Sequence, residues 1–143
     1  MTVRTFALIV GIAYLAAGVM GFVPGLVTPA PGHAPALGVT AFQGYLLGLF
    51  PVNFMHNLMH LAIGAWGVAA SRGTGGARAY SKIIAVIFGV LAVMGLIPTL
   101  NTVFGLVPIH GNDVWLHAGT AVIAAFFGWV VKGSSVVSAT PAH

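Results

Sequence analysis

The sequence predicts an all-α integral membrane protein in which four transmembrane helices form two helical hairpins that repeat one another. First, charged residues make up only 4% of the 143-residue chain and hydrophobic residues 59%, and the mean hydropathy is +1.04. So few charges cannot cover a water-soluble domain of this size. Second, four apolar stretches approach the ~20 residues that span a bilayer core. Third, one half of the chain resembles the other.

The four apolar stretches set the bounds of the predicted helices, which are Phe6 to Val23, Phe54 to Ala70, Tyr80 to Ile97 and Asn112 to Val131. The first stretch is longer than the core of about 7–15 residues that is usual in a secretory signal, so we expect it to be retained. Together the helices predict a single transmembrane domain over residues 1–133. Residues 134–143 are expected to form a flexible cytoplasmic tail.

The repeat is visible when the sequence is compared with itself. A shift of 57 residues places Gly48-Leu49-Phe50-Pro51 on Gly105-Leu106-Val107-Pro108 without a gap, and Val19-Met20-Gly21 recurs as Val93-Met94-Gly95. The two repeats cover about residues 5–71 and 79–131. Because two crossings return the chain to its starting side, we expect the repeats to run parallel, related by an axis along the membrane normal.

The connections differ in composition. Both connections on the predicted outer side have an apolar part, Phe42 to Phe50 and Leu100 to Val107, which we expect to lie in the membrane interface as short helices or re-entrant turns. The first of these connections is long and rich in proline. Ser71 to Ala79 is rich in glycine and is expected to be a plain cytoplasmic loop. Small residues at Ala13, Ala17 and Gly21 are expected to let helices pack closely.

Positive charge predicts the orientation. Cytoplasmic connections carry an excess of lysine and arginine, and all five such residues fall on one side of the four-pass arrangement. The two connections on the other side have none, so both termini are expected in the cytoplasm and the net charge of +4 implies no nucleic-acid partner. The five residues are Arg4, Arg72, Arg78, Lys82 and Lys132.

Four polar side chains form the most distinctive pattern. Asp113 is the sole acidic residue of the chain, and the 57-residue shift places His56 on Asp113 and His60 on His117. Residues four apart project from the same face of a helix. Three imidazoles and one carboxylate are therefore expected to converge between the second and fourth helices. That set suits zinc, copper, iron or nickel, with Asn57 and Asn112 as candidates to orient the imidazoles.

The same residues leave two further hypotheses open. In one, His60 and His117 ligate a haem iron or a chlorin-type pigment. Three glycines would give the flat ring room, and aromatic residues would line its pocket. In the other, Asp113 and His56 form a structural clamp that joins the repeats, with Asn112 as a helix cap. The glycines are Gly64, Gly67 and Gly119, and the aromatic residues are Trp66, Trp115, Phe54 and Tyr45.

Two strings of the chain resemble the bacterial domain-of-unknown-function family 4383. They run from Leu49 to Gly64 and from Gly105 to His117, and the resemblance extends from about Thr5 to Val131. It implies a small multi-pass protein of the bacterial cytoplasmic membrane. It implies no chemistry, although His60 and His117 match motif positions of the family, and His56 and Asp113 match its polar positions one turn earlier.

The sequence as a whole favours a non-enzymatic structural or accessory subunit, with the clamp ahead of either cofactor hypothesis alone. Its expected partners are the lipid bilayer and other membrane proteins or further copies of the chain. The alternative is a metal-, haem- or chlorin-binding protein for electron transfer, sensing or light harvesting. The absence of cysteine excludes thiolate sites, and a single carboxylate makes transport a weaker hypothesis. His110, opposite Asn53 in the repeat, is expected to be a solvated loop residue or an entry ligand.

Overall fold

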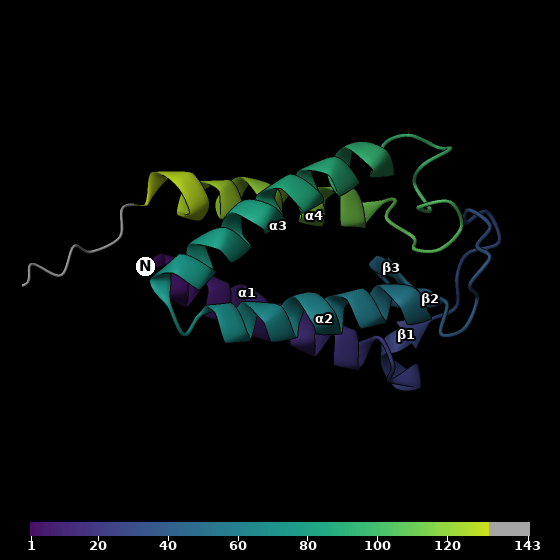
Figure 1. Ribbon diagram of the computed structural model, residues 1–143. Helices are drawn as coiled ribbons and strands as arrows, with labels where there is room; N and C mark the ends of the chain where they lie inside the picture. Colours follow the sequence, from purple (N-terminus) through teal and green to yellow (C-terminus); the bar gives the residue numbers. More distant parts are fainter. Residues whose placement is uncertain (132–143) are drawn as a thin grey trace, which may run out of the picture.

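The computed structural model describes residues 1–131 and is mostly helical. Its helices are α1 (Val3–Met20), α2 (Phe54–Ala70), α3 (Thr74–Gly95) and α4 (Asn112–Ala125), and a π-helical turn, η2 (Phe126–Val130), continues α4. In Figure 1, α1 packs against α2 in the lower layer and α3 packs against α4 in the upper layer. The predicted tail and Lys132 lie outside the described residues.

Three of the helical segments are long and apolar enough to cross a membrane: Val3–Met20, Thr74–Gly95 and Asn112–Val130. Helix α2, with 17 residues, is shorter. Large apolar side chains face outward on the helices; Val19, Val86 and Val122 expose 57%, 58% and 71% of their surface. An apolar outer surface on an apolar bundle is what contact with lipid requires, and it supports the prediction of a membrane protein.

The bounds predicted for the second helix agree with those of α2, whereas the bounds predicted for the other helices differ from those in the structure. The loop expected over Ser71 to Ala79 is much shorter, because α3 begins at Thr74. Gly75 and Gly76 lie in the first turn of α3 in spite of their low helix propensity. The burial of Ala77 and Tyr80, both 0% exposed, explains why this turn is helical: tertiary packing outweighs local propensity.

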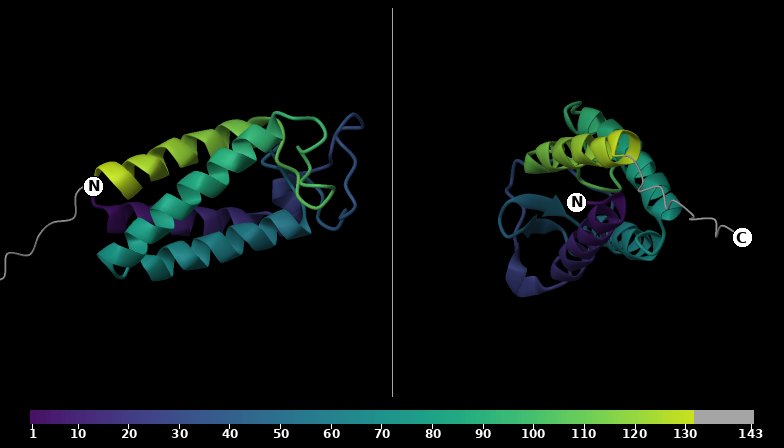
Figure 2. Two further views of the ribbon diagram at one scale, coloured as in Figure 1. Left: turned by 45° about the horizontal axis from the view of Figure 1, so that its top comes forward. Right: turned by 90° about the vertical axis from the view of Figure 1, so that its left-hand side faces the viewer.

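The end of the bundle opposite the N-terminus, which we call the loop end, comprises residues 21–53 and 96–111 (Figure 2). It contains a 3₁₀ turn, η1 (Pro24–Leu26), and an antiparallel sheet of β1 (Val27–Thr28), β2 (Gly44–Leu46) and β3 (Phe50–Val52), in that order. The all-α prediction therefore holds for most of the described chain but misses this small sheet, and the short helix, one of the two alternatives for Phe42 to Phe50, is wrong.

The physical reason is a left-handed backbone at the turn between β2 and β3. Leu47 and Gly48 have φ of 53° and 71°, which reverses the chain and pairs Tyr45 with Pro51. Residues 100–107 likewise form successive turns, with Phe104 and Gly105 at φ 57° and 84°. A helix cannot continue through two such residues.

The two halves of the chain bury corresponding positions. A shift of 74 residues, which places Tyr14 on Phe88, superposes every buried residue of α1 on a buried residue of α3. The 57-residue shift superposes every buried residue of α2 on a buried residue of α4 or η2. In α2 these are His56, Asn57, His60, Gly64, Gly67 and Ala70; downstream they are Asp113, Val114, His117, Ala121, Ala124 and Phe127.

Glycines bring α1 and α2 into backbone contact. A Cβ atom added to Gly64 would lie 2.5 Å from the Leu15 nitrogen, and one added to Gly11 would lie 2.6 Å from the Val68 nitrogen. Small residues permit this close approach in apolar surroundings. Of the stripe expected at Ala13, Ala17 and Gly21, only Gly21 is buried, against the Asn57 side chain of α2. Ala13 is exposed, and the buried face of α1 runs through Gly11, Tyr14 and Gly18.

Candidate functional site

The four predicted site residues lie in the first two turns of α2 and α4, at the loop end of the bundle. All four are buried, with 3% of His56, 5% of His60, 1% of Asp113 and 2% of His117 exposed. Polar groups at this depth need partners, because an unpaired buried polar group is costly. The partners that the structure gives them decide what the site can do.

The backbone at each helix start orients the first pair. Asn53 caps α2 by accepting a hydrogen bond from the His56 N–H at 2.9 Å. Helix α4 begins after Gly111, which has φ 64°. The prediction that Asn112 caps this helix is therefore wrong: its side chain donates to the Leu49 carbonyl oxygen at 3.2 Å. Asp113 occupies the first turn of α4, where the helix dipole favours a negative charge.

Asp113 joins the two helices at the centre of the cluster. Its Oδ2 lies 3.8 Å from His56 Nε2 and 3.5 Å from His117 Nδ1. One ligand atom from each of the three residues falls within 4.8 Å of the other two. For comparison, metal bonds of about 2.0–2.2 Å place neighbouring tetrahedral ligand atoms about 3.4 Å apart. The distances from Asp113 Oδ2 to His56 Nε2 and to His117 Nδ1 are thus close to the distances between neighbouring ligand atoms in a zinc-type site.

The hydrogen bond of His56 fixes which nitrogen faces Asp113. His56 Nδ1 lies 3.0 Å from the carbonyl oxygen of Pro51. A carbonyl oxygen only accepts, so Nδ1 carries the hydrogen, and in the neutral ring Nε2 carries a free lone pair. That lone pair is directed at the Asp113 carboxylate, which is also an acceptor. A backbone carbonyl that holds a ligating imidazole in one tautomer is the usual support of a histidine metal ligand.

The remaining polar atoms of the cluster have no hydrogen-bond partner among the described residues. These buried atoms are both carboxylate oxygens of Asp113, His117 Nδ1 and both ring nitrogens of His60. A buried carboxylate that faces the His56 lone pair at 3.8 Å needs a positive charge or a proton between the two groups. A divalent cation meets this need with three ligands already in place.

His60 does not join the three-residue group, in contrast to the four-ligand prediction. Its ring lies one helical turn further from the loop end, with its centroid 4.3 Å from that of His56 and 5.2 Å from that of Tyr14. It is nevertheless 95% buried with both nitrogens unpartnered. It is therefore the nearest additional donor that a small movement could bring to the cluster.

The sequence interpretation missed two aromatic residues that line the cluster. Tyr14 packs edge-on against His60, and Phe88 packs against His117 with ring centroids 4.8 Å apart. The Tyr14 hydroxyl also meets that of Thr120 at 3.4 Å. The repeat could have revealed them: the shift that aligns Val19-Met20-Gly21 with its second copy also aligns Tyr14 with Phe88.

The space expected for a flat pigment ring beside two of the glycines does not exist. A Cβ at Gly64 would collide with the backbone of α1, and one at Gly67 would meet Gly11 and the Tyr80 hydroxyl. Gly119 is open, with no atom within 4 Å of an added Cβ.

The aromatic residues expected to line a pigment pocket also lie elsewhere. Trp66 packs on Tyr80, Phe54 on Phe22, Tyr45 near His110, and Trp115 is 70% exposed. None of these contacts involves the four residues of the cluster.

The two asparagines expected to orient the imidazoles have other roles. Asn57 donates to the Gly21 carbonyl oxygen at 2.7 Å and so ties α2 to the end of α1. Asn112 ties α4 to the β2–β3 turn. In the loops, His110 is half buried, which lowers the pKa of its imidazole, whereas His33 is exposed.

Comparison with known proteins places the chain in a family. The family described as "Domain of unknown function (DUF4383)" matches residues 4–130, which is most of the chain and includes all four cluster residues. No curated protein and no solved structure matches the chain. The sequence resemblance is thereby confirmed: this chain belongs to the domain-of-unknown-function family 4383.

Proposed function

We propose that this chain is a non-enzymatic, four-pass protein of the bacterial cytoplasmic membrane that binds one divalent transition-metal ion through His56, Asp113 and His117. The observation that carries the proposal is the buried Asp113 carboxylate, which faces two imidazole nitrogens at 3.5 and 3.8 Å and has no hydrogen-bond donor among the described residues. Two nitrogen ligands and one oxygen ligand are the donor set of many zinc sites.

The donor set also limits the metal. Imidazole and carboxylate together suit zinc, copper, iron, nickel or cobalt, whereas magnesium and calcium prefer oxygen ligands alone. Three protein ligands leave a fourth position for water, for His60 or for a ligand from outside. The absence of thiolate ligands removes the softest donors, which favours a borderline divalent ion over Cu(I).

The proposed topology rests on two features of the bundle. Corresponding buried positions in α1 and α3, and in α2 and α4, support two parallel hairpins that cross the membrane in the same sense. Arg4 lies in the first turn of α1, Arg72 lies in the connection between α2 and α3, and Arg78 and Lys82 lie in the first half of α3. This distribution favours termini in the cytoplasm and therefore a cluster near the outer leaflet.

The decisive experiment is a metal analysis of protein purified in mild detergent without a histidine tag. We expect near-stoichiometric zinc, copper, iron, nickel or cobalt in the wild type by plasma mass spectrometry. His56→Ala, Asp113→Asn and His117→Ala should each lose the metal. The matched control is His33→Ala, which removes an exposed histidine of the loop end. An absorption spectrum of the same sample reveals whether any iron or magnesium belongs to a haem or a chlorin instead.

A structural clamp between Asp113 and His56 is the second candidate, and one distance favours it. With its Nε2 protonated, His56 would form a buried ion pair with Asp113 Oδ2 at 3.8 Å that joins α2 to α4. His117 Nδ1, which lies 3.5 Å from the same oxygen, would add to this pair from within α4 when it carries a hydrogen. The chain would then be a structural or accessory subunit that contacts other membrane proteins or further copies of itself. Wild-type protein that holds no metal, and takes up none when it is offered, would favour this candidate over the metal site.

A further inference from the structure

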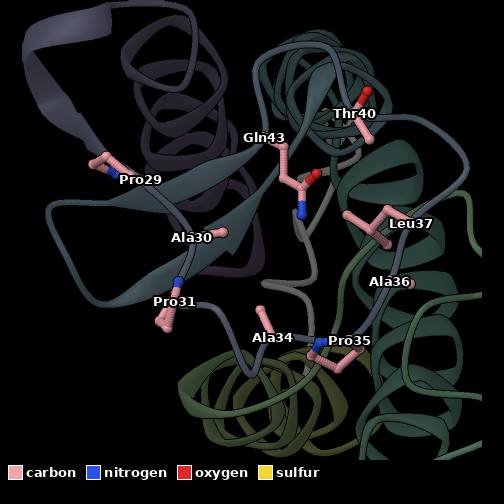
Figure 3. Close-up of a pocket in the computed structure, with 9 residues that line it drawn as sticks. All are labelled: Pro29, Ala30, Pro31, Ala34, Pro35, Ala36, Leu37, Thr40 and Gln43. Atoms are coloured by element: carbon pink, nitrogen blue, oxygen red, sulfur yellow. The ribbon is translucent and has the colours of Figure 1, made fainter.

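The proline-rich part of the first connection surrounds a wide cavity at the loop end. Its volume is about 530 Å³, and Figure 3 shows the side chain of Gln43 reaching into it from one wall. Alanine and proline make up most of the lining, so the walls offer few groups that would hold a polar solute. The lining residues are Pro29, Ala30, Pro31, Ala34, Pro35, Ala36, Leu37, Thr40 and Gln43.

A second, much smaller cavity, which we call the neck, shares part of its lining with the first. Its volume is about 10 Å³, which is close to the space that one water molecule needs. Ala34, Pro35 and Gln43 are among the residues that line both cavities. The neck therefore lies beside the wide cavity, and its space suits one small solute at a time.

The neck adjoins the backbone that supports the His/Asp cluster. Pro51 and Pro108, which correspond in the two repeats, are part of its wall. The carbonyl oxygen of Pro51 also accepts the hydrogen bond from His56 Nδ1 at 3.0 Å. One residue thus contacts both the neck and a ligand of the proposed metal site.

His110 is the imidazole at this neck. It lines the small cavity, is half buried, and lies three residues before Asp113 in the sequence. Its counterpart in the first repeat is Asn53, which caps α2 and donates to the carbonyl oxygens of Val39 and Leu106 at 2.9 and 2.8 Å. No side-chain hydrogen bond ties His110 to the other described residues in this way, so its nitrogens remain available to a ligand.

We infer that residues 29–43 form a vestibule on the outer side of the membrane and that His110 captures metal ions there for transfer to His56, Asp113 and His117. This inference rests on the proposed function. The geometry that carries it is a wide cavity, an adjoining neck of single-solute size with an imidazole in its wall, and Pro51, which lines the neck and accepts the hydrogen bond of the ligand His56.

The test measures rates separately from affinity. Metal-free protein is mixed rapidly with Co²⁺, whose visible absorption reports coordination by the site. A residue that acts only on the entry path changes loading and release by the same factor. We expect His110→Ala to slow both by roughly tenfold, which corresponds to ~1.4 kcal/mol of barrier, with the dissociation constant unchanged. His33→Ala, which removes an exposed histidine of the first connection, should load like the wild type.

A second variant pair tests the vestibule itself. The chain has no cysteine, so a single introduced thiol can be labelled selectively. Ala36→Cys lies in the vestibule wall and Gly32→Cys lies in the same connection outside the lining. A bulky maleimide attached at position 36 should slow Co²⁺ loading, and the same label at position 32 should not.

The outcomes separate the two proposals. If the His110→Ala variant loads Co²⁺ as fast as the wild type, the entry role of His110 is overturned, whereas the proposed metal site is not. His110→Ala with a weakened dissociation constant would also overturn it, because His110 would then be a ligand of the site. Wild-type protein that takes up no Co²⁺ would contradict the proposed function, and the entry path with it.

Discussion

At the scale of the residue, Asp113 dominates the electrostatics of the bundle. It is the sole carboxylate of the sequence, it is 1% exposed, and neither of its oxygens receives a hydrogen bond from the described residues. Ionisable groups within apolar surroundings are expensive, and those that persist are usually functional. Pairing with a bound cation removes this cost, whereas pairing with neutral imidazole lone pairs does not.

Replacing Asp113 with asparagine should abolish metal-dependent stabilisation. A ligand that binds the native state at a hundred times its dissociation constant stabilises it by about 2.7 kcal/mol. We expect the wild type to show this gain in thermal unfolding with Zn²⁺ and Asp113→Asn to show none, because a neutral amide is a poor ligand. Equal stabilisation of both proteins by Zn²⁺ would place the metal elsewhere.

At the scale of the element, helix pairs are held by backbone contact where a side chain would not fit. Gly64 of α2 faces Gly11 and Leu15 of α1, one turn beyond His60. This contact fixes the position of α2 against α1, and with it the direction in which the histidines project. The loop end adds a second constraint through Asn53, which caps α2 and bonds both connections.

Gly64→Ala should destabilise the protein by about 1–3 kcal/mol, because overpacking at a close backbone contact forces the helices apart. Gly119→Ala is the matched control on α4, where an added Cβ meets no atom within 4 Å. There the gain in helix propensity should stabilise by about 0.5–1 kcal/mol. Denaturant unfolding in mixed micelles measures the stability change of each variant. Similar changes for Gly64→Ala and Gly119→Ala would contradict the role of the backbone contact at Gly64.

Asn53→Ala should cost more than Asn53→Ser. Alanine removes the helix cap, worth about 0.5–2 kcal/mol, and both hydrogen bonds to the connections. Serine keeps a neutral oxygen for the His56 N–H, but its single hydroxyl cannot replace both donations, to Val39 and to Leu106. The difference between the unfolding free energies of the two variants should therefore separate the contribution of the helix cap from that of the hydrogen bonds to the two connections. Equal losses would mean that the cap contributes nothing measurable.

At the scale of the whole molecule, positive charge and the His/Asp cluster lie at opposite ends of the bundle. The described positive residues lie toward the end with the N-terminus, where Arg4 Nε donates to the Ser71 carbonyl oxygen at 2.8 Å. The cluster, the sheet and the cavities lie at the loop end. With the proposed orientation, a metal site at the loop end would exchange with the outside of the cell.

Single cysteines test this orientation directly. Gly32 lies at the loop end and Gly73 in the α2–α3 connection, both without atoms near an added Cβ. In intact cells, a membrane-impermeant thiol reagent should label Gly32→Cys at once and Gly73→Cys after permeabilisation alone. The reverse pattern would place the termini outside and the cluster near the cytoplasm.

The sequence alone determined the helices and the polar pairs, because both follow from local periodicity and from the repeat. The bounds of α2 were predicted correctly, and His56 does lie next to Asp113 across two helices. A four-residue spacing fixes the face of a helix on which a side chain lies. No tertiary information is needed for that step.

Tertiary structure decided the rest, because the deciding contacts join residues far apart in the sequence. The Pro51 carbonyl selects the tautomer of His56, and the Gly11 backbone fills the space beside Gly64 that a pigment would need. His60 is not part of the three-residue group, although it follows His56 by four residues just as His117 follows Asp113. The proline-rich connection becomes the wall of a cavity because the Gly38 N–H bonds the Gly105 carbonyl oxygen at 2.8 Å. Periodicity encodes which side of a helix faces inward, but not which atom it meets there.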